Sequence, residues 1–184
     1  IPYETSRGCF EKCTFCSTAQ YFGKKFRKKS VKTVVDEIKH AVEKYGVEEV
    51  EFIDDNIAID WRRFHALCDG LAGLNIHFTV PCGIRFDYMK KDEQVYELYE
   101  KMQKAGFYQI TFPIESGNHH VLNNLVKKGL DLDRMKRLIS KAKEFGFQTH
   151  SFFIVGFPNE TREQINDTIR YAEEIATDSY SFSL

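Results

Sequence analysis

The chain has 184 residues, of which 42% are hydrophobic and 14% aromatic, which suits one domain with a substantial core and excludes intrinsic disorder. Its 26 basic and 27 acidic residues leave a net charge of −1, so charge gives no argument for binding nucleic acid or an anionic membrane. No apolar run approaches the ~18 residues of a membrane span, and the first residues do not resemble a signal peptide. We expect a soluble, cytoplasmic chain.

Strands and helices are predicted to alternate along the whole chain. Apolar residues at helical spacing mark five helices, and short β-rich runs lie between them. In chain order the predicted elements are strand 2–7, helix 31–45, strand 47–54, helix 60–71, strand 76–84, helix 95–105, strand 109–115, helix 131–145, strand 148–155, helix 161–175 and strand 179–184. A capping box at 161–164 marks the start of the last helix. This alternation predicts a parallel α/β sheet.

Two architectures fit this order, a partial (β/α)6 TIM-like barrel and a flat, doubly wound sheet. In strand 76–84, polar residues such as His77 and Thr79 alternate with apolar ones such as Phe78 and Cys82. A flat sheet covered on both sides would be apolar on both faces, so the alternation favours the barrel, with its last helix missing. Because the chain starts at Ile1 rather than Met and stops within a predicted strand, we expect residues 1–184 to be the core domain of a longer protein.

Three cysteines directly after the first predicted strand are the sharpest signal. Cys9, Cys13 and Cys16 have the spacing C-x₃-C-x₂-C, which brings three thiols to one small inorganic centre. An odd total of five cysteines without secretory features argues against a disulfide framework. Structural zinc prefers four ligands, usually in paired C-x₂-C arms, and a redox pair Cys13/Cys16 leaves Cys9 unexplained. A cubane iron–sulfur cluster held by three thiolates would keep one iron free for an exogenous ligand.

This motif, with an aromatic residue before its last cysteine, resembles the signature of the radical S-adenosylmethionine (SAM) superfamily. The segments TSRGCFEKCTFCS and VVDEI resemble most closely the cobalamin-dependent branch of that superfamily. The resemblance implies that Cys9, Cys13 and Cys16 hold a 4Fe–4S cluster, that SAM chelates the free iron, and that Phe15 packs near the adenine. It also implies cobalamin on a domain N-terminal to this core and a C-terminal cap, neither of which lies in the sequence.

Polar residues at other strand ends match the family's SAM-binding positions. Asp54 and Asp55 stand where the family binds the methionine amino group, although Asx turns before a helix use the same residues. Arg85 has the fixed charge that suits the SAM carboxylate, or an ion pair with Asp87.

Two later motifs complete this set. Glu115 and Ser116 belong to an ESG sequence that resembles the family's contact to the ribose and amino group, with Gly117 allowing close backbone approach. Gly156, in the sequence GFPNE, resembles the position where the branch holds adenine through its backbone.

Other chemically interesting residues have plainer interpretations. Cys68 and Cys82 fall on apolar faces and are predicted to be core residues. His119 and His120 could face a substrate, and the basic run 24–29 could meet an anionic substrate or an electron donor, but solvated loops are the default for both.

The resemblance predicts an enzyme that cleaves SAM reductively to a 5′-deoxyadenosyl radical for hydrogen abstraction from a small molecule. It implies a one-electron donor such as flavodoxin or ferredoxin, and a role within a cobalamin-dependent methyltransferase or cyclase. The alternative is a non-catalytic zinc, iron–sulfur or redox module on the same barrel.

Overall fold

Six parallel strands form two adjoining three-stranded sheets, and the strands follow one another in the order in which they occur in the sequence. In the computed structural model, which describes all residues 1–184, β1 (Pro2–Tyr3), β4 (Glu49–Phe52) and β5 (His77–Thr79) form one three-stranded sheet. A second sheet contains β6 (Gln109–Glu115), β7 (Gln148–Ile154) and β8 (Ser179–Ser183). A parallel bridge between Phe78 and Phe107 joins the two sheets. The order never reverses, as it would in a doubly wound sheet, so the partial barrel is confirmed.

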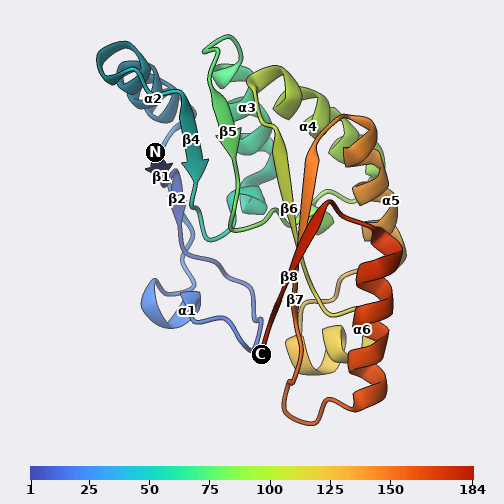
Figure 1. Cartoon of the computed structure of the whole chain (residues 1–184). Coiled ribbons are helices and arrows are strands. Elements are labelled where there is room, and N and C mark those ends of the chain that lie inside the picture. The colour runs from blue at the N-terminus through green and yellow to red at the C-terminus, as the bar shows by residue number, and fades with distance from the viewer.

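Five long helices connect these strands and lie outside the sheet (Figure 1). They are α2 (Val31–Tyr45), α3 (Trp61–Leu71), α4 (Asp92–Ala105), α5 (Leu132–Glu144) and α6 (Arg162–Ile175). Side chains cap three of the helix starts by accepting backbone N–H bonds: Ser30 from Thr33, Asp60 from Arg63, and Asp131 from Arg134. The capping box predicted at Thr161 is also present. No helix is both long and apolar enough to cross a bilayer.

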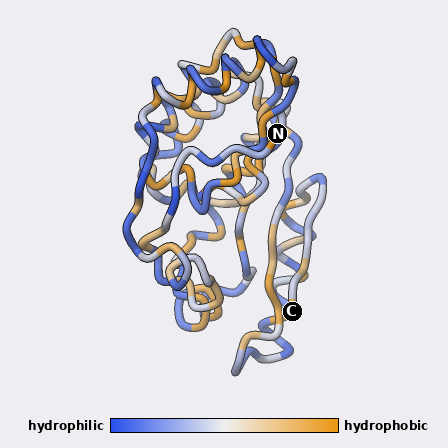
Figure 2. Tube along the Cα trace, turned by 90° about the vertical axis from the view of Figure 1, so that its left-hand side faces the viewer, coloured by the Kyte–Doolittle hydropathy of each residue, from blue (hydrophilic) through white to orange (hydrophobic).

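One hydrophobic core fills the space between the sheet and the helices. Figure 2 shows hydrophobic stretches along the strands and alternating colours along the helices. Phe52 and Phe78, on adjacent strands, stack with ring centroids 5.6 Å apart, and Phe107 lies 5.2 Å from Phe78. All three belong to a single cluster of 37 buried side chains that includes residues of both sheets. The two sheets therefore share one core and behave as one structural unit.

The predicted first strand is divided by the structure. Only Pro2–Tyr3 pairs with β4, whereas β2 (Ser6–Arg7) turns away and pairs antiparallel with β3 (Arg27–Lys28). The cysteines and the short helix α1 (Thr18–Tyr21) lie between β2 and β3. This excursion forms the arm at the carboxyl ends of the strands, below β4 in Figure 1.

The predicted strand 76–84 is too long, and this error misplaces Cys82. The strand ends at Thr79, and Val80 to Gly83 form a turn in which the Gly83 N–H donates to the Val80 carbonyl at 3.2 Å. Pro81 has no N–H to continue the ladder, and Gly83 adopts a φ of +93° that favours glycine. The alternation of faces is lost at this turn. Cys82 is therefore exposed rather than part of the core, whereas Cys68 is buried as predicted.

Candidate active site

The cysteine loop, residues 8–18, is fixed at both ends by Asp55. One carboxylate oxygen of Asp55 accepts the Gly8 N–H at 2.7 Å, and the other accepts the Thr18 hydroxyl at 3.1 Å. Asp55 follows β4, so the end of a central strand sets the distance between the two ends of the loop. The geometry gives Asp55 a positioning role for the loop as well as a place at the site.

The middle of the loop is held by the opposite half of the barrel. The Thr14 N–H donates to the Val126 carbonyl at 3.1 Å, and its hydroxyl donates to the Leu125 carbonyl at 2.5 Å. Leu125 and Val126 end a π-helical segment, η3 (Val121–Val126), that follows the ESG sequence. The cysteine loop thus spans the mouth of the open barrel and is fastened to both halves.

A third anchor joins the loop to the turn after β5. The Glu11 carboxylate lies 3.1 Å from Arg85 Nη1 and accepts the Tyr88 hydroxyl at 2.8 Å. Arg85 also donates to Asp87 at 3.0 Å through Nε and to the Lys128 carbonyl at 3.2 Å. Burial alone would lower the pKa of Arg85. The hydrogen bond to Asp87 and the charge of Asp87 outweigh burial, so the pKa of Arg85 is raised above its ordinary value. Arg85 is a permanent cation that holds the loop in place.

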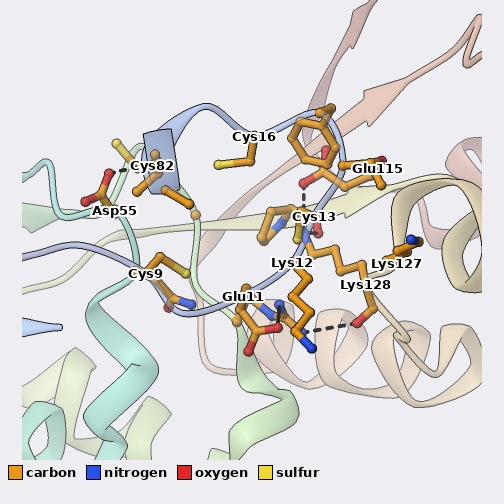
Figure 3. Close-up of a pocket in the computed structure, with 18 of the residues that line it drawn as sticks. Cys9, Glu11, Lys12, Cys13, Cys16, Asp55, Cys82, Glu115, Lys127 and Lys128 are labelled. Carbon is orange, nitrogen blue, oxygen red and sulfur yellow. Dashed lines mark hydrogen bonds and ion pairs between the residues drawn. The ribbon is translucent and has the colours of Figure 1, made fainter. Parts of the chain in front are cut away.

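These anchors enclose a cavity of about 470 Å³ at the carboxyl ends of the strands. Its volume lies within the range of small-molecule sites. Figure 3 shows Cys9, Cys13 and Cys16 around an open space. Cys82 lies beside Asp55, on the side of this space opposite Glu115. The cavity is lined by Cys9, Glu11, Lys12, Cys13, Thr14, Phe15, Cys16, Thr18, Ala19, Lys24, Asp55, Asn56, Cys82, Gly83, Arg85, Pro113, Glu115, Lys127 and Lys128.

The thiols of the loop differ in their surroundings. Cys9 and Cys13 are half-buried, whereas Cys16 is exposed. Burial raises the pKa of the Cys9 and Cys13 thiols, so both favour the neutral form in the absence of a cation. A metal centre that supplies positive charge would deprotonate them, as it does for coordinating thiols in general. No three His, Cys, Asp or Glu side chains gather closely enough to hold a single metal ion.

Glu115 reaches the cavity from a bulge in β6. The register of β6 against β7 shifts between Pro113 and Glu115, and Glu115 has a φ of +72°, which is rare for a side chain with a Cβ. Its Oε1 accepts a hydrogen bond from Lys128 Nζ at 2.7 Å, and both side chains are buried. Lys128 also donates to the Pro113 carbonyl. Oε2 of Glu115 has no protein hydrogen-bond partner and remains available to a ligand.

The other two residues of the ESG sequence face the helix layer instead of the cavity. Ser116 is fully buried, and its hydroxyl lies 3.0 Å from that of Thr168 on α6. A Cβ added to Gly117 would lie 2.4 Å from Tyr171 Cβ and 2.8 Å from Thr168 Cα. Glycine is therefore required here by close packing against α6, a reason different from the ligand approach that we predicted.

Phe15 and Gly156 lie at the edge of the site. Phe15 lines the cavity and is 43% exposed, with its ring 6.2 Å from that of Phe157. Gly156 is exposed and does not line the cavity, and its N–H donates to the Glu160 carboxylate at 2.6 Å. Phe15 and the GFPNE segment thus face each other across one side of the opening.

Asp54 and Asp55 have separate environments, which the sequence could not distinguish. Asp54 is fully buried, does not line the cavity, and accepts the Thr5 N–H at 3.0 Å and the Thr5 hydroxyl at 2.7 Å. The Ser6 hydroxyl also donates to it. Arg63 donates to the Thr5 carbonyl at 3.3 Å and completes the network. Asp54 fastens the segment that leads into the cysteine loop.

We expect Asp54→Asn to lower the free energy of unfolding by about 2 kcal/mol, because hydrogen bonds to a charged acceptor contribute about 1.5–3 kcal/mol. Urea denaturation measures this, with Asp36→Asn as the control because Asp36 is an exposed residue of α2 paired only with Lys32. Unchanged stability combined with loss of SAM binding would instead make Asp54 a ligand residue.

The remaining candidates are mostly engaged in ordinary surface contacts. Within the basic run, Arg27 and Lys28 form β3, Lys28 pairs with Asp60, and Lys29 pairs with Glu37 at 2.7 Å. His119 and His120 are exposed, and His120 lies 3.0 Å from Asn124. Neither histidine lines the cavity.

Sequence reasoning missed several residues of the site, among them Glu11, Tyr88, Lys127 and Lys128. Glu11 lies inside the cysteine motif, but nothing in the motif indicated that it would reach Arg85. Lys128 lies between the predicted strand 109–115 and the predicted helix 131–145, where the sequence indicates no element and a lysine is ordinarily solvated. Only the fold, which brings η3 beside the cysteine loop, shows that Glu11, Lys127 and Lys128 line the cavity and that Tyr88 donates a hydrogen bond to Glu11.

Comparisons with known proteins concern the chain as a whole. The profile of the Radical SAM superfamily matches residues 3–172. Cytidylyl-2-hydroxyethylphosphonate methyltransferase of Streptomyces wedmorensis is 39% identical over 97% of this chain and 34% of its own length. Anaerobic magnesium-protoporphyrin IX monomethyl ester cyclase of Cereibacter sphaeroides is 29% identical over 97% of this chain and 29% of its own length. The chain thus spans about a third of the length of these curated relatives.

A solved structure confirms the fold. The radical SAM methyltransferase TsrM of Kitasatospora setae, solved with cobalamin and a [4Fe–4S] cluster bound, superposes with a TM-score of 0.86 over all of this chain and 36% of TsrM. The sequence identity of 18% limits this likeness to the fold. The profile covers most of the chain, including the cysteine loop and the strand ends that line the cavity, and the chain belongs to the radical SAM superfamily.

Proposed function

We propose that the chain is the catalytic core of a radical SAM enzyme, in which Cys9, Cys13 and Cys16 hold a 4Fe–4S cluster and SAM occupies the adjacent cavity. The observation that carries this proposal is the anchored loop, which presents three thiols to a cavity of about 470 Å³. In a cluster each thiolate binds its own iron, so the sulfur atoms need not converge on one point. The absence of a compact three-ligand site therefore disfavours the zinc alternative.

When bound, such a cluster supplies the electron that cleaves SAM into methionine and a 5′-deoxyadenosyl radical. The chain's own residues would bind and orient SAM. Oε2 of Glu115 would accept a hydrogen bond from a ribose hydroxyl or the amino group, and Phe15 would contact the adenine together with the segment at Gly156. Asp55, which binds both ends of the loop, and Arg85, which pairs with Glu11 within it, would keep the thiols in register with these contacts.

We further propose that the complete protein is a cobalamin-dependent methyltransferase acting on a small molecule. Support comes from the 39% identical methyltransferase, and the cyclase is the runner-up among the activities of the relatives. Cobalamin would be held outside residues 1–184. A one-electron donor such as flavodoxin or ferredoxin, in the cytoplasm, would reduce the cluster.

The test is anaerobic reconstitution with iron and sulfide, followed by electron paramagnetic resonance of the reduced chain with and without SAM. We expect about four irons per chain and a cubane signal that changes when SAM is added, because one iron has no protein ligand. A single bound zinc, or a cluster signal that does not respond to SAM, would contradict the proposal.

A further inference from the structure

The two intervals of the C-x₃-C-x₂-C motif differ in how their backbone is held. The shorter interval is closed by its own hydrogen bond, in which the Cys16 N–H donates to the Cys13 carbonyl at 3.2 Å. No backbone–backbone hydrogen bond involves the longer interval, from Cys9 to Lys12. Its shape therefore depends on its side-chain contacts, because a segment without backbone bonds opens at little cost in free energy.

The two residues that follow Cys9 both contact Tyr88. The Phe10 ring meets the Tyr88 ring edge to face, with centroids 6.2 Å apart, and the Glu11 carboxylate accepts the Tyr88 hydroxyl at 2.8 Å. Tyr88 belongs to a 3₁₀ helix, η2 (Phe86–Tyr88), that follows the turn after β5. Tyr88 does not line the cavity, so it can affect a ligand there only through the residues that it contacts.

Tyr88 is itself held in place by the end of β4. Asn56 is buried, and its Nδ2 donates to the Tyr88 hydroxyl at 3.1 Å. Its Oδ1 accepts a backbone N–H two residues further on, which fixes the orientation of the amide. On the other side, the Arg85 guanidinium lies 5.4 Å from the centre of the Tyr88 ring. Because the hydroxyl accepts from Asn56, its single proton is directed to the Glu11 carboxylate.

Three consecutive residues after β4 thus hold three parts of the cysteine loop. Asp54 binds the segment that leads into the loop, and Asp55 binds its two ends. Asn56 reaches the longer interval through Tyr88 and Glu11. The end of a central strand is therefore a common reference for the whole loop, and the Tyr88 hydroxyl connects that reference to the part of the loop that lacks backbone bonds.

We infer that Tyr88 is a positioning residue of the cluster site, which through Glu11 fixes the place of the Cys9 thiol. Where it concerns the cluster, the inference rests on the proposed function, in which Cys9 is a ligand. Without the Tyr88 hydroxyl, Glu11 keeps only its ion pair with Arg85, and the longer interval moves more freely. Loss of a group that orients a metal ligand typically lowers metal affinity by about 10- to 100-fold.

Thiol alkylation of the cluster-free chain tests the position of Cys9 without any cofactor. We expect Tyr88→Phe to raise the rate of Cys9 alkylation by iodoacetamide about tenfold, because the half-buried thiol becomes accessible when the loop is released. Peptide mass spectrometry follows each cysteine separately, and Cys16, which is already exposed, is the internal control. Tyr99→Phe is the matched variant, since the Tyr99 hydroxyl also donates one hydrogen bond, to the Leu138 carbonyl at 3.2 Å within the core.

Reconstituted chains test the consequence for the cluster. We expect iron to pass from Tyr88→Phe to a chelator about tenfold faster than from the unchanged chain, whereas Tyr99→Phe should release iron at the unchanged rate. Glu11→Ala should release iron at least as fast as Tyr88→Phe. The double variant Glu11→Ala/Tyr88→Phe should be no faster than Glu11→Ala alone, because the two substitutions remove the same contact.

Equal Cys9 alkylation in Tyr88→Phe and the unchanged chain would overturn the inference. Increases of the same size in Tyr88→Phe and Tyr99→Phe would also overturn it, since they would reflect a general loss of stability. Effects of Tyr88→Phe and Glu11→Ala on iron release that multiply in the double variant would show that the hydroxyl acts by another route. Failure of the proposed function has a different signature, namely no SAM-dependent change in the paramagnetic signal of the unchanged chain, and the alkylation result does not depend on that signal.

Discussion

Cys13→Ala is expected to abolish cluster binding, lowering the iron content of the reconstituted chain from about four atoms to less than one and removing the cubane signal. Cys13 lies at the centre of the motif, and the next residue, Thr14, is hydrogen-bonded to the backbone of Leu125 and Val126. The loop therefore cannot shift easily to bring another donor into the vacant place. Iron and sulfide analysis with paramagnetic resonance measures the effect.

Cys82→Ala is the matched control for this experiment. Cys82 lines the same cavity, but it lies on the turn after β5 next to Asp55, outside the C-x₃-C-x₂-C loop. We expect the Cys82 variant to keep a full cluster. Loss of iron in both variants would mean that four cysteines hold the cluster and that no iron is left for SAM.

The alternation of strands and helices could be predicted from the sequence because it depends on local patterns. The capping box at Thr161 and the helical spacing of 31–45 each belong to one element and appear unchanged in the structure. The order of elements alone fits both a barrel and a doubly wound sheet, and the barrel was chosen from the alternation of polar and apolar residues along the predicted strands. The prediction became wrong where a local break interrupted the pattern, at Pro81 and Gly83, and Cys82 was misplaced as a consequence.

The candidate site was predicted only in part, for a similar reason. The spacing of the cysteines is a local property, so these residues could be identified directly. The roles of neighbouring residues depend on which segments meet. Asp54 and Asp55 are adjacent in sequence, yet one is buried against Thr5 and the other spans the ends of the cysteine loop. Likewise, the Lys128–Glu115 pair joins residues 13 positions apart through an irregular segment that no periodicity predicts.

Lys128→Met is expected to lower the free energy of unfolding by about 3–5 kcal/mol, a large part of the total of about 5–15 kcal/mol for a typical domain. Lys128 and Glu115 have side chains only 4% and 7% exposed, and their charged atoms are 2.7 Å apart. Removal of the ammonium leaves the Glu115 carboxylate buried without a counter-charge. It also removes the donor to the Pro113 carbonyl, which lies at the bulge of β6.

The double variant Glu115→Gln/Lys128→Met separates this charge effect from lost packing. Since neither partner is then charged, we expect it to recover at least half of the stability lost by Lys128→Met, and urea denaturation of both variants measures the coupling. Lys104→Met is the surface control, because Lys104 pairs with Glu100 on the exposed side of α4 and should change stability by about 0.5 kcal/mol or less. If the double variant is no more stable than Lys128→Met, lost packing and not the unpaired charge of Glu115 accounts for the loss of stability on this side of the cavity.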